Sequence, residues 1–300
     1  MNNLFLIKTL QNINTMKKNI LMVITIMLFG FSNAQLGDLL KQAGNKTKEK
    51  LEKKAKEKVS GNSSKSKSSK EFSEGNTVLF SENFSAGKGF PVSMMTNSSA
   101  QIVELDGKNW LQLGSEGAFT FKALIPEKLI KDKVLKDRNL PDNFTFEFDV
   151  YTNENFKYNT KELATVFASL KVLKTDFKKW GENRYDGTGV KTGIHPIEFG
   201  DKDKGQTRMM LYENGKETSK TEKAQRVFTI EKNVGKVQFM RNGTQLRVFL
   251  NGEKIWDVQD AFEENVKYNA IIFTTGEYKD DNKFFISNIK LTTDIIVEPK

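Results

Sequence analysis

NGTQLRVFLNGEKI, residues 242–255, contains two Asn-Gly pairs on either side of a short run of alternating residues. Asn-Gly favours a two-residue β-hairpin turn more than almost any other dipeptide, because both residues tolerate positive φ. The runs before, between and after the pairs, KVQFMR, QLRVFL and EKIWDV, are typical of strands. The stretch therefore predicts three antiparallel strands in a meander, with type I′ turns at Asn242-Gly243 and Asn251-Gly252.

The same period of two recurs from residue 77 onward. NFTFEFDVY, residues 143–151, places phenylalanine and valine on one face and mostly polar residues on the other, as in a strand with one buried side. Strands without alternating helices favour an all-β domain over residues 77–300, a two-sheet antiparallel jelly-roll sandwich. One short helix is predicted around 126–137, and further strands are predicted at 77–81, 101–105, 109–113, 118–124, 163–173, 194–200, 207–213, 226–231, 268–275 and 283–291.

The N-terminal region has the pattern of a secretory signal. Residues 16–34, MKKNILMVITIMLFGFSNA, combine two lysines, a short apolar run and small residues before a cleavage point after Ala34. The apolar run is shorter than the roughly 20 residues that a membrane-spanning helix needs. Residues 1–34 are therefore predicted to be a signal peptide, with Met16 as an alternative start. We expect an exported protein in the periplasm, in the outer membrane or outside the cell.

Two polar segments follow the signal. Residues 35–59 are rich in lysine and place Leu, Ala, Thr and Val at spacings of three and four, which predicts a basic amphipathic helix. Its narrow apolar stripe favours a solvated tether, and the alternative is peripheral contact with an anionic membrane or a partner helix. Residues 60–76, SGNSSKSKSSKEFSEGN, are predicted to be a flexible linker.

Charge and cysteine content exclude two classes of protein. The formal net charge is +9, but residues 1–34 carry +3 and residues 35–70 carry +7, so the remainder is at −1. Nucleic-acid-binding domains concentrate Lys and Arg on their own surface, so no nucleic-acid partner is predicted. The chain has no cysteine, which excludes disulfides and an acylated lipoprotein cysteine, so core burial must stabilise the fold.

Four segments carry a family resemblance: LFSENFSAGKGFP (79–91), LPDNFTFEFDVYT (140–152), GKVQFMRNGTQLRVFLNGEKIWDV (235–258) and IIFTTGEYKDDNKFFISNIKL (271–291). They resemble the concanavalin A-like lectin/glucanase jelly roll, which includes laminin-G-like domains. With the signal and the Lys-rich segment, the chain is similar to the N-terminal part of OmpA-family envelope proteins of Bacteroidetes, without their C-terminal domain. The resemblance implies that the last strand pairs with the first. It leaves the ligand open, because this fold hosts lectins, glycosidases and interaction modules.

A catalytic role is not predicted. The resemblance implies an E-x-D-x-x-E motif in the β-glucanases of this superfamily, and here Glu147 and Asp149 are followed by Thr152 at the third position. The single histidine, His195, is interpreted as a turn or strand-end residue. We therefore expect a non-catalytic module that binds a glycan or an envelope protein, and the alternative is a glycoside hydrolase with carboxylates from separate strands.

Two candidate ligand-binding regions remain. Trp110 and Trp256 alternate with polar residues inside strands and are predicted to be core. Trp180 lies in the polar, Gly-rich stretch 178–190, which predicts an exposed ring on a loop, and the alternative is a ring folded back over the sandwich edge. The candidate residues are Trp180, Asn183, Arg184, Tyr185 and Asp186 on this loop, and Glu147, Asp149 and Tyr151 on the solvated sheet face.

No cofactor is predicted. Calcium is the alternative, because loops contain the acidic residues Asp201, Asp203, Asp257, Asp260, Asp280 and Asp281. Calcium takes six to eight oxygen ligands, and lysines adjoin the first two aspartates, so solvated charged loops are the preferred interpretation.

Overall fold

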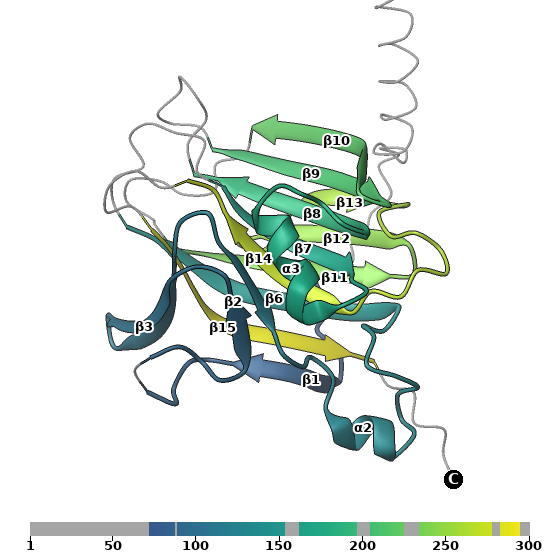
Figure 1. Ribbon diagram of the computed structural model, residues 1–300, viewed down its shortest axis with the longest axis horizontal. Helices are drawn as coiled ribbons and strands as arrows, with labels where there is room; N and C mark the ends of the chain where they lie inside the picture. Colours follow the sequence, from purple (N-terminus) through teal and green to yellow (C-terminus); the bar gives the residue numbers. More distant parts are fainter. Residues whose placement is uncertain are drawn as a thin grey trace, which may run out of the picture. The chain divides into compact units, whose positions relative to one another are not determined.

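The computed structural model describes residues 72–87, 89–153, 162–196, 205–224, 234–277 and 283–294. Within these ranges the chain forms two antiparallel sheets that pack as a sandwich, as predicted (Figure 1). No helix in the described ranges is long and apolar enough to cross a membrane. Several predicted features lie outside the described residues: the signal peptide, the basic segment 35–59, residues 60–71 of the linker, the strand 226–231, and Asp201, Asp203, Asp280 and Asp281.

In the described part of the chain, one sheet has eight strands in the order β13-β12-β11-β6-β15-β4-β3, with β1 paired to β15. The pairing of the first and last strands runs from Thr77 opposite Thr293 to Glu82 opposite Ile289, which confirms the expectation from the resemblance. The strands are β1 (Thr77–Glu82), β3 (Ala100–Leu105), β4 (Lys108–Leu113), β6 (Asn143–Thr152), β11 (Val234–Asn242), β12 (Gln245–Leu250), β13 (Glu253–Val258) and β15 (Phe284–Thr293).

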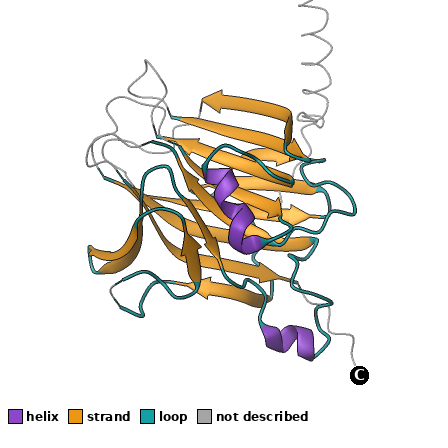
Figure 2. Cartoon of the chain, viewed as in Figure 1, coloured by secondary structure: helices purple, strands orange, loops and turns teal. Residues whose placement is uncertain are grey.

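The second sheet has seven strands among the described residues, in the order β10-β9-β8-β7-β14-β5-β2. Figure 2 shows a helix, α3 (Leu173–Gly181), lying across this sheet. The only other helix in the described ranges, α2 (Glu127–Lys131), falls inside the stretch predicted to be helical. The strands are β2 (Met94–Thr96), β5 (Ala118–Phe121), β7 (Leu163–Ser169), β8 (Thr188–His195), β9 (Gln206–Glu213), β10 (Lys216–Ala224) and β14 (Ala270–Thr275).

Two strand predictions in this second sheet were wrong, and its strands β2 and β10 were not predicted. The strand predicted at 163–173 ends at Ser169, and α3 follows it. The strand predicted at 194–200 begins at Thr188 and ends at His195, so its first six residues were taken for a loop. β10 was not predicted, because KETSKTEKA has no apolar face. At a sheet edge, pairing with β9 stabilises the strand without such a face.

The two Asn-Gly turns are both present, but one lies a residue later than predicted. Asn251 and Gly252 have φ of 52° and 84°, as a type I′ turn requires. In the other hairpin Asn242 pairs with Gln245, so the central residues are Gly243 and Thr244. Gly243 alone has positive φ, 61°, which fits a type II′ turn. The meander β11-β12-β13 is confirmed.

Phenylalanine rings fill the space between the sheets. Phe146, Phe148, Phe167, Phe239 and Phe273 are all fully buried. Two pairs of these rings meet edge to face, with centroids 4.9 Å apart for Phe148 and Phe273 and 5.2 Å apart for Phe167 and Phe239. Edge-to-face aromatic pairs add about 0.5–1.5 kcal/mol to the burial of their surface. Trp110 and Trp256 are also buried, as predicted, but only Trp256 joins the cluster between the sheets, and Trp110 packs on Tyr151 on the outer side of its sheet.

The last residues of the predicted linker contact the eight-stranded sheet. Phe72 packs edge to face on Phe249, with centroids 5.7 Å apart. The amide of Gly75 donates a hydrogen bond to Thr292 Oγ1 at 2.9 Å, and Glu74 forms an ion pair with Lys290. The packed domain therefore begins a few residues before β1.

Candidate functional site

The outward face of β8 contains two glycines where larger side chains would not fit. Alternate strand residues face opposite sides of a sheet. Val190 and Ile194 join the inter-sheet core, so residues 189, 191, 193 and 195 face outward. A β-carbon at Gly189 would collide with the indole ring of Trp180, and one at Gly193 would collide with the carboxylate of Glu162. The two glycines therefore make room for two side chains against the sheet.

Helix α3 brings Trp180 onto this face. Phe177 and Trp180 are three residues apart and therefore lie on the same side of the helix, where both are buried in an apolar cluster on the sheet. Asp176 Oδ2 accepts a hydrogen bond from the amide of Val172 at 2.9 Å, which satisfies a donor at the start of the helix. Lys179 contacts both Asp176 and Asp186, and so ties the helix to the following turn.

Trp180 supports a pair of tyrosines. The rings of Tyr185 and Tyr212 are tilted by 32° with centroids 4.1 Å apart, and each lies 5.3 Å from the indole of Trp180. Burial raises the pKa of the Tyr212 hydroxyl far above its usual value, so it stays protonated. Tyr185 is only half-buried, and its hydroxyl donates a hydrogen bond to Asn183 Oδ1 at 3.0 Å. Tyr185 thus presents an aromatic surface that its neighbours hold in place.

A buried charge cluster lies beside the tyrosines. Glu162 Oε2 is 3.1 Å from Lys191 Nζ, and Glu162 Oε1 is 3.3 Å from His195 Nε2. Burial raises the pKa of Glu162, but its contact with His195 and the charge of Lys191 together outweigh that effect and lower its pKa to about 2. Glu162 is therefore ionised at neutral pH, and it compensates the buried Lys191.

Two further cations come from β9 and β10. Arg208 Nε and Lys220 Nζ each lie 2.9 Å from Glu222 Oε1. The hydrogen bond from Lys220 and the charges of both cations lower the pKa of Glu222. Among the described residues, the guanidinium of Arg208 makes this contact through Nε alone.

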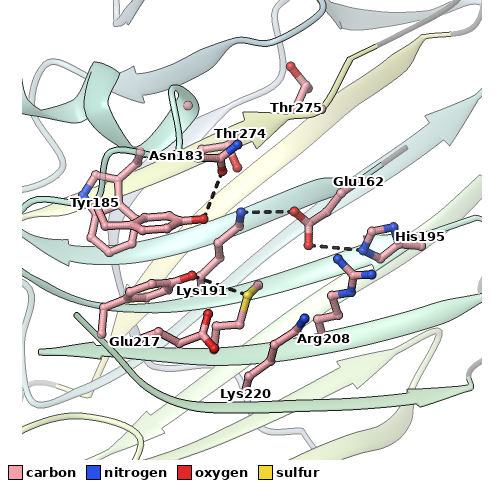
Figure 3. Close-up of a pocket in the computed structure, with 15 residues that line it drawn as sticks. Glu162, Asn183, Tyr185, Lys191, His195, Arg208, Glu217, Lys220, Thr274 and Thr275 are labelled. Atoms are coloured by element: carbon pink, nitrogen blue, oxygen red, sulfur yellow. Dashed lines mark hydrogen bonds and ion pairs between the residues drawn. The ribbon is translucent and has the colours of Figure 1, made fainter. Parts of the chain in front are cut away.

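These side chains surround one cavity, which we call the outer-face cavity. Its volume is about 470 Å³, within the range of small-ligand sites. Figure 3 shows Tyr185 and Asn183 at one end, Glu162, His195 and Arg208 at the other, and Lys191 between them. The lining residues are Glu162, Trp180, Gly181, Asn183, Tyr185, Lys191, His195, Arg208, Met210, Tyr212, Glu217, Lys220, Thr274, Thr275 and Gly276.

Only some of the residues predicted on the loop line the cavity. Asn183 and Tyr185 line the cavity, whereas Arg184 pairs with Glu182 and Asp186 with Lys179. The prediction of an exposed Trp180 was wrong, because its side chain is fully buried. Residues 173–181 form a helix that turns the Trp180 ring toward the sheet. There the ring packs on Tyr185 and Tyr212 and lines part of the cavity. The alternative, a ring folded back on the sandwich, is what the structure has.

The other three predicted residues lie on β6, in the opposite sheet. Glu147 contacts Lys236 at 3.0 Å and Gln238 at 2.9 Å, and Asp149 contacts Lys108 at 2.6 Å. Tyr151 packs between Trp110 and Phe285, with ring centroids 5.7 and 5.2 Å away. These residues do not share a site with Tyr185, and lysine and amide side chains contact both carboxylates.

Sequence reasoning missed Glu162, Lys191 and Arg208. His195 was correctly predicted to end a strand, but its place in the cavity was not. TGVKTGIH, residues 188–195, did carry a signal, since one face of that strand reads Gly, Lys, Gly, His. Small residues beside charged ones on one face indicate that other side chains approach the sheet there.

Metal ligands do not cluster in the described part of the chain. No group of three or more His, Asp or Glu residues there could hold a metal ion. Asp257, one of the aspartates considered for calcium, contacts Lys254 at 2.7 Å and Arg247 at 3.5 Å.

Comparison with family models gives no match, and comparison with curated proteins gives none either. Among solved structures, the chain is similar to the binding domain of botulinum neurotoxin DC in complex with rat synaptotagmin II, at 13% identity and a TM-score of 0.44, covering 74% of this chain and 49% of that one. It is also similar to the botulinum neurotoxin type G receptor binding domain, at 12% identity and a TM-score of 0.41, covering 74% of this chain and 49% of that one. A third match is sheep galectin-11 in complex with glycerol, at 12% identity and a TM-score of 0.35, covering 51% of this chain and 92% of that one. The chain spans about half the length of the neurotoxin chains.

Proposed function

We propose that the sandwich is a non-catalytic binding module that takes a saccharide in the outer-face cavity. One observation carries this proposal: a half-buried tyrosine ring and several charged side chains converge on a single cavity of about 470 Å³. The apolar face of a sugar ring packs on an aromatic side chain, and its hydroxyls need donors and acceptors nearby. Tyr185 supplies the ring, and Lys191 and Glu217 supply a donor and an acceptor.

The neighbouring contacts hold this arrangement rigid before a ligand binds. Tyr185 rests on Tyr212 and Trp180, and the ion pair with Glu162 fixes Lys191. A site that is already ordered loses little conformational entropy on binding. The concave shape also favours a small ligand or a chain end over a protein partner, which needs about 800 Å² of surface on each side. An envelope protein remains the alternative partner from the sequence.

A glycoside hydrolase is the second candidate, because two carboxylates, Glu162 and Glu217, line the same cavity. Such enzymes pair an ionised carboxylate with a protonated one. The lowered pKa of Glu162, about 2, suits only the ionised role. Lys191 and His195 already contact both oxygens of Glu162, which opposes its use as a nucleophile. We therefore propose binding without turnover.

We also propose that the chain is exported. The support is the signal pattern of residues 16–34 and the resemblance to laminin-G-like domains and to envelope proteins of the OmpA family. The basic segment 35–59 would then tether the module, or contact an anionic membrane surface. Mass spectrometry of the exported chain should give a mature protein beginning at Gln35, and an uncleaved N-terminus would contradict this.

Two matched tyrosine variants test the site. Tyr185 and Tyr151 are both half-buried and both pack on aromatic neighbours, but they lie on opposite sheets. We expect Tyr185→Ala to weaken saccharide binding by about 1–3 kcal/mol and Tyr151→Ala to leave it unchanged. If Tyr151→Ala weakens binding and Tyr185→Ala does not, the binding site lies on β6 and not in the outer-face cavity. Release of reducing sugar by the wild-type protein would favour the hydrolase.

A further inference from the structure

The charges in the outer-face cavity point to a more specific ligand, and this inference rests on the proposed function. The lining residues in the described ranges include Lys191, Arg208, Lys220 and His195 on the basic side. The acidic side chains in the lining are Glu162 and Glu217. A site for neutral sugars has no need of three permanent cations, because uncharged side chains can also donate and accept hydrogen bonds with hydroxyl groups and amides.

The buried carboxylate does not neutralise all of these cations. Glu162 is matched by its contacts with Lys191 and His195, whose side chains are only 5% and 3% exposed. Arg208 and Lys220 share a single oxygen of Glu222, which stands outside the cavity lining. Arg208 and Lys220 therefore share one carboxylate at this end of the cavity, while Glu162, Glu217 and Glu222 together balance Lys191, Arg208 and Lys220.

The geometry of Arg208 suits an anionic group. Its contact with Glu222 uses Nε at 2.9 Å, so the terminal amino groups are the part of the guanidinium that can reach a ligand. Figure 3 shows the guanidinium directed toward His195, with the Lys220 ammonium on the same side and Glu217 nearer the Tyr185 end. Guanidinium groups bind planar carboxylates through two parallel hydrogen bonds.

We propose that the ligand is an acidic saccharide, whose ring packs on Tyr185 and whose carboxylate or sulfate group binds Arg208 and Lys220. The hydroxyl groups of the same sugar reach Lys191 and Glu217. Binding would place the negative group where two cations share one carboxylate, and the sugar ring beside the aromatic surface of Tyr185.

The test uses matched ligands with the full chain. Calorimetry would compare uronic-acid oligosaccharides with the same oligosaccharides after reduction of their carboxyl groups to neutral sugars, and with sulfated neutral oligosaccharides as a third arm. We expect the acidic ligands to bind at least about tenfold more tightly than the neutral ones, since hydrogen bonds to charged groups are the stronger kind. The affinity for acidic ligands should also fall as salt is added.

Lys220 has a matched control on the other sheet. Lys220 and Lys236 are both 44% exposed, and each pairs with one glutamate, at 2.9 and 3.0 Å. Arg208→Gln and Lys220→Gln should each weaken binding of the acidic ligand about tenfold and leave neutral binding nearly unchanged. Lys236→Gln should leave the affinity for both the acidic and the neutral ligand unchanged.

Three outcomes would contradict the proposals. Neutral ligands that bind as tightly as acidic ones would overturn the acidic preference and leave the proposed function standing. Equal losses of affinity for the acidic ligand in Lys220→Gln and Lys236→Gln would also overturn the acidic preference and leave the proposed function standing. If no saccharide in any arm binds, both the proposed function and this inference are wrong. A response to the sulfated arm alone would support the anion site and assign it to sulfate.

Discussion

Lys191 Nζ lies 3.1 Å from Glu162 Oε2 on the outward face of β8, and the two side chains are 5% and 15% exposed. Buried ions of opposite charge need each other, because either one left alone would lack both water and a partner. Gly193 permits the contact, since any side chain there would displace the carboxylate. The fold thus maintains a charged pair inside a cavity.

Glu162→Gln should destabilise the domain by about 3–5 kcal/mol, because it leaves Lys191 buried without an opposite charge. Urea unfolding would measure the change. Glu217→Gln is the matched control, since Glu217 lines the same cavity but is exposed. It should shift the free energy of unfolding by less than about 0.5 kcal/mol. Equal losses in the two variants would show that the ion pair does not matter.

The same pair predicts how stability depends on pH. The folded pKa of Glu162, about 2, lies below its ordinary value of 4.5, so folding favours the ionised form. This contribution, ~3 kcal/mol, is fully present above pH 4.5 and is lost as the pH falls toward about 2. The stability difference between wild type and Glu162→Gln should therefore narrow over that window. A difference that stays constant down to pH 2 would contradict the assignment.

Gly189→Ala should destabilise the domain by about 1–3 kcal/mol, because the new β-carbon would overlap the buried Trp180 ring. Thermal and urea unfolding of the single variant would give the loss. In the Trp180→Leu background the same change should cost less, since the smaller side chain leaves room. A cost that is the same in both backgrounds would mean that the glycine matters for another reason.

The hairpin turns should affect stability without affecting binding. Gly243 and Gly252 have φ of 61° and 84°, and a β-carbon at either position would touch nothing within 4 Å. Replacing either by Ala should therefore cost only the backbone penalty, about 1 kcal/mol. Saccharide affinity of the folded protein should be unchanged. If affinity falls while stability does not, these turns are part of the recognition surface.

The sandwich could be predicted because its signals are local. Period-two alternation in residues 143–151 predicts β6, and the two Asn-Gly pairs predict the β11-β12-β13 meander, each from a short stretch of sequence. Helix α3 was not predicted, because its local signal is weak. Its apolar side consists of Phe177 and Trp180, and its other residues are polar enough to be taken for a loop. The spacing of three residues between Phe177 and Trp180 was the one feature here that could have indicated a helix.

The cavity could not be predicted, because its residues meet only through the tertiary fold. Glu162 precedes β7, Lys191 lies on β8 and Arg208 on β9, and the sequence does not say which faces these strands turn outward. Tyr185 and Asn183 were found because a polar, Gly-rich stretch with aromatic residues is typical of binding loops. The carboxylates of β6 were chosen because they lie on the solvated face of their strand, and they belong to the opposite sheet.

A crystal structure of the full chain with a bound uronic-acid oligosaccharide would show directly whether the outer-face cavity binds an acidic saccharide. We expect a sugar ring over Tyr185, with its carboxylate within hydrogen-bond distance of Arg208 or Lys220. A sugar bound beside Glu147, Asp149 and Tyr151 on β6 would contradict it, as would an outer-face cavity left empty at saturating ligand.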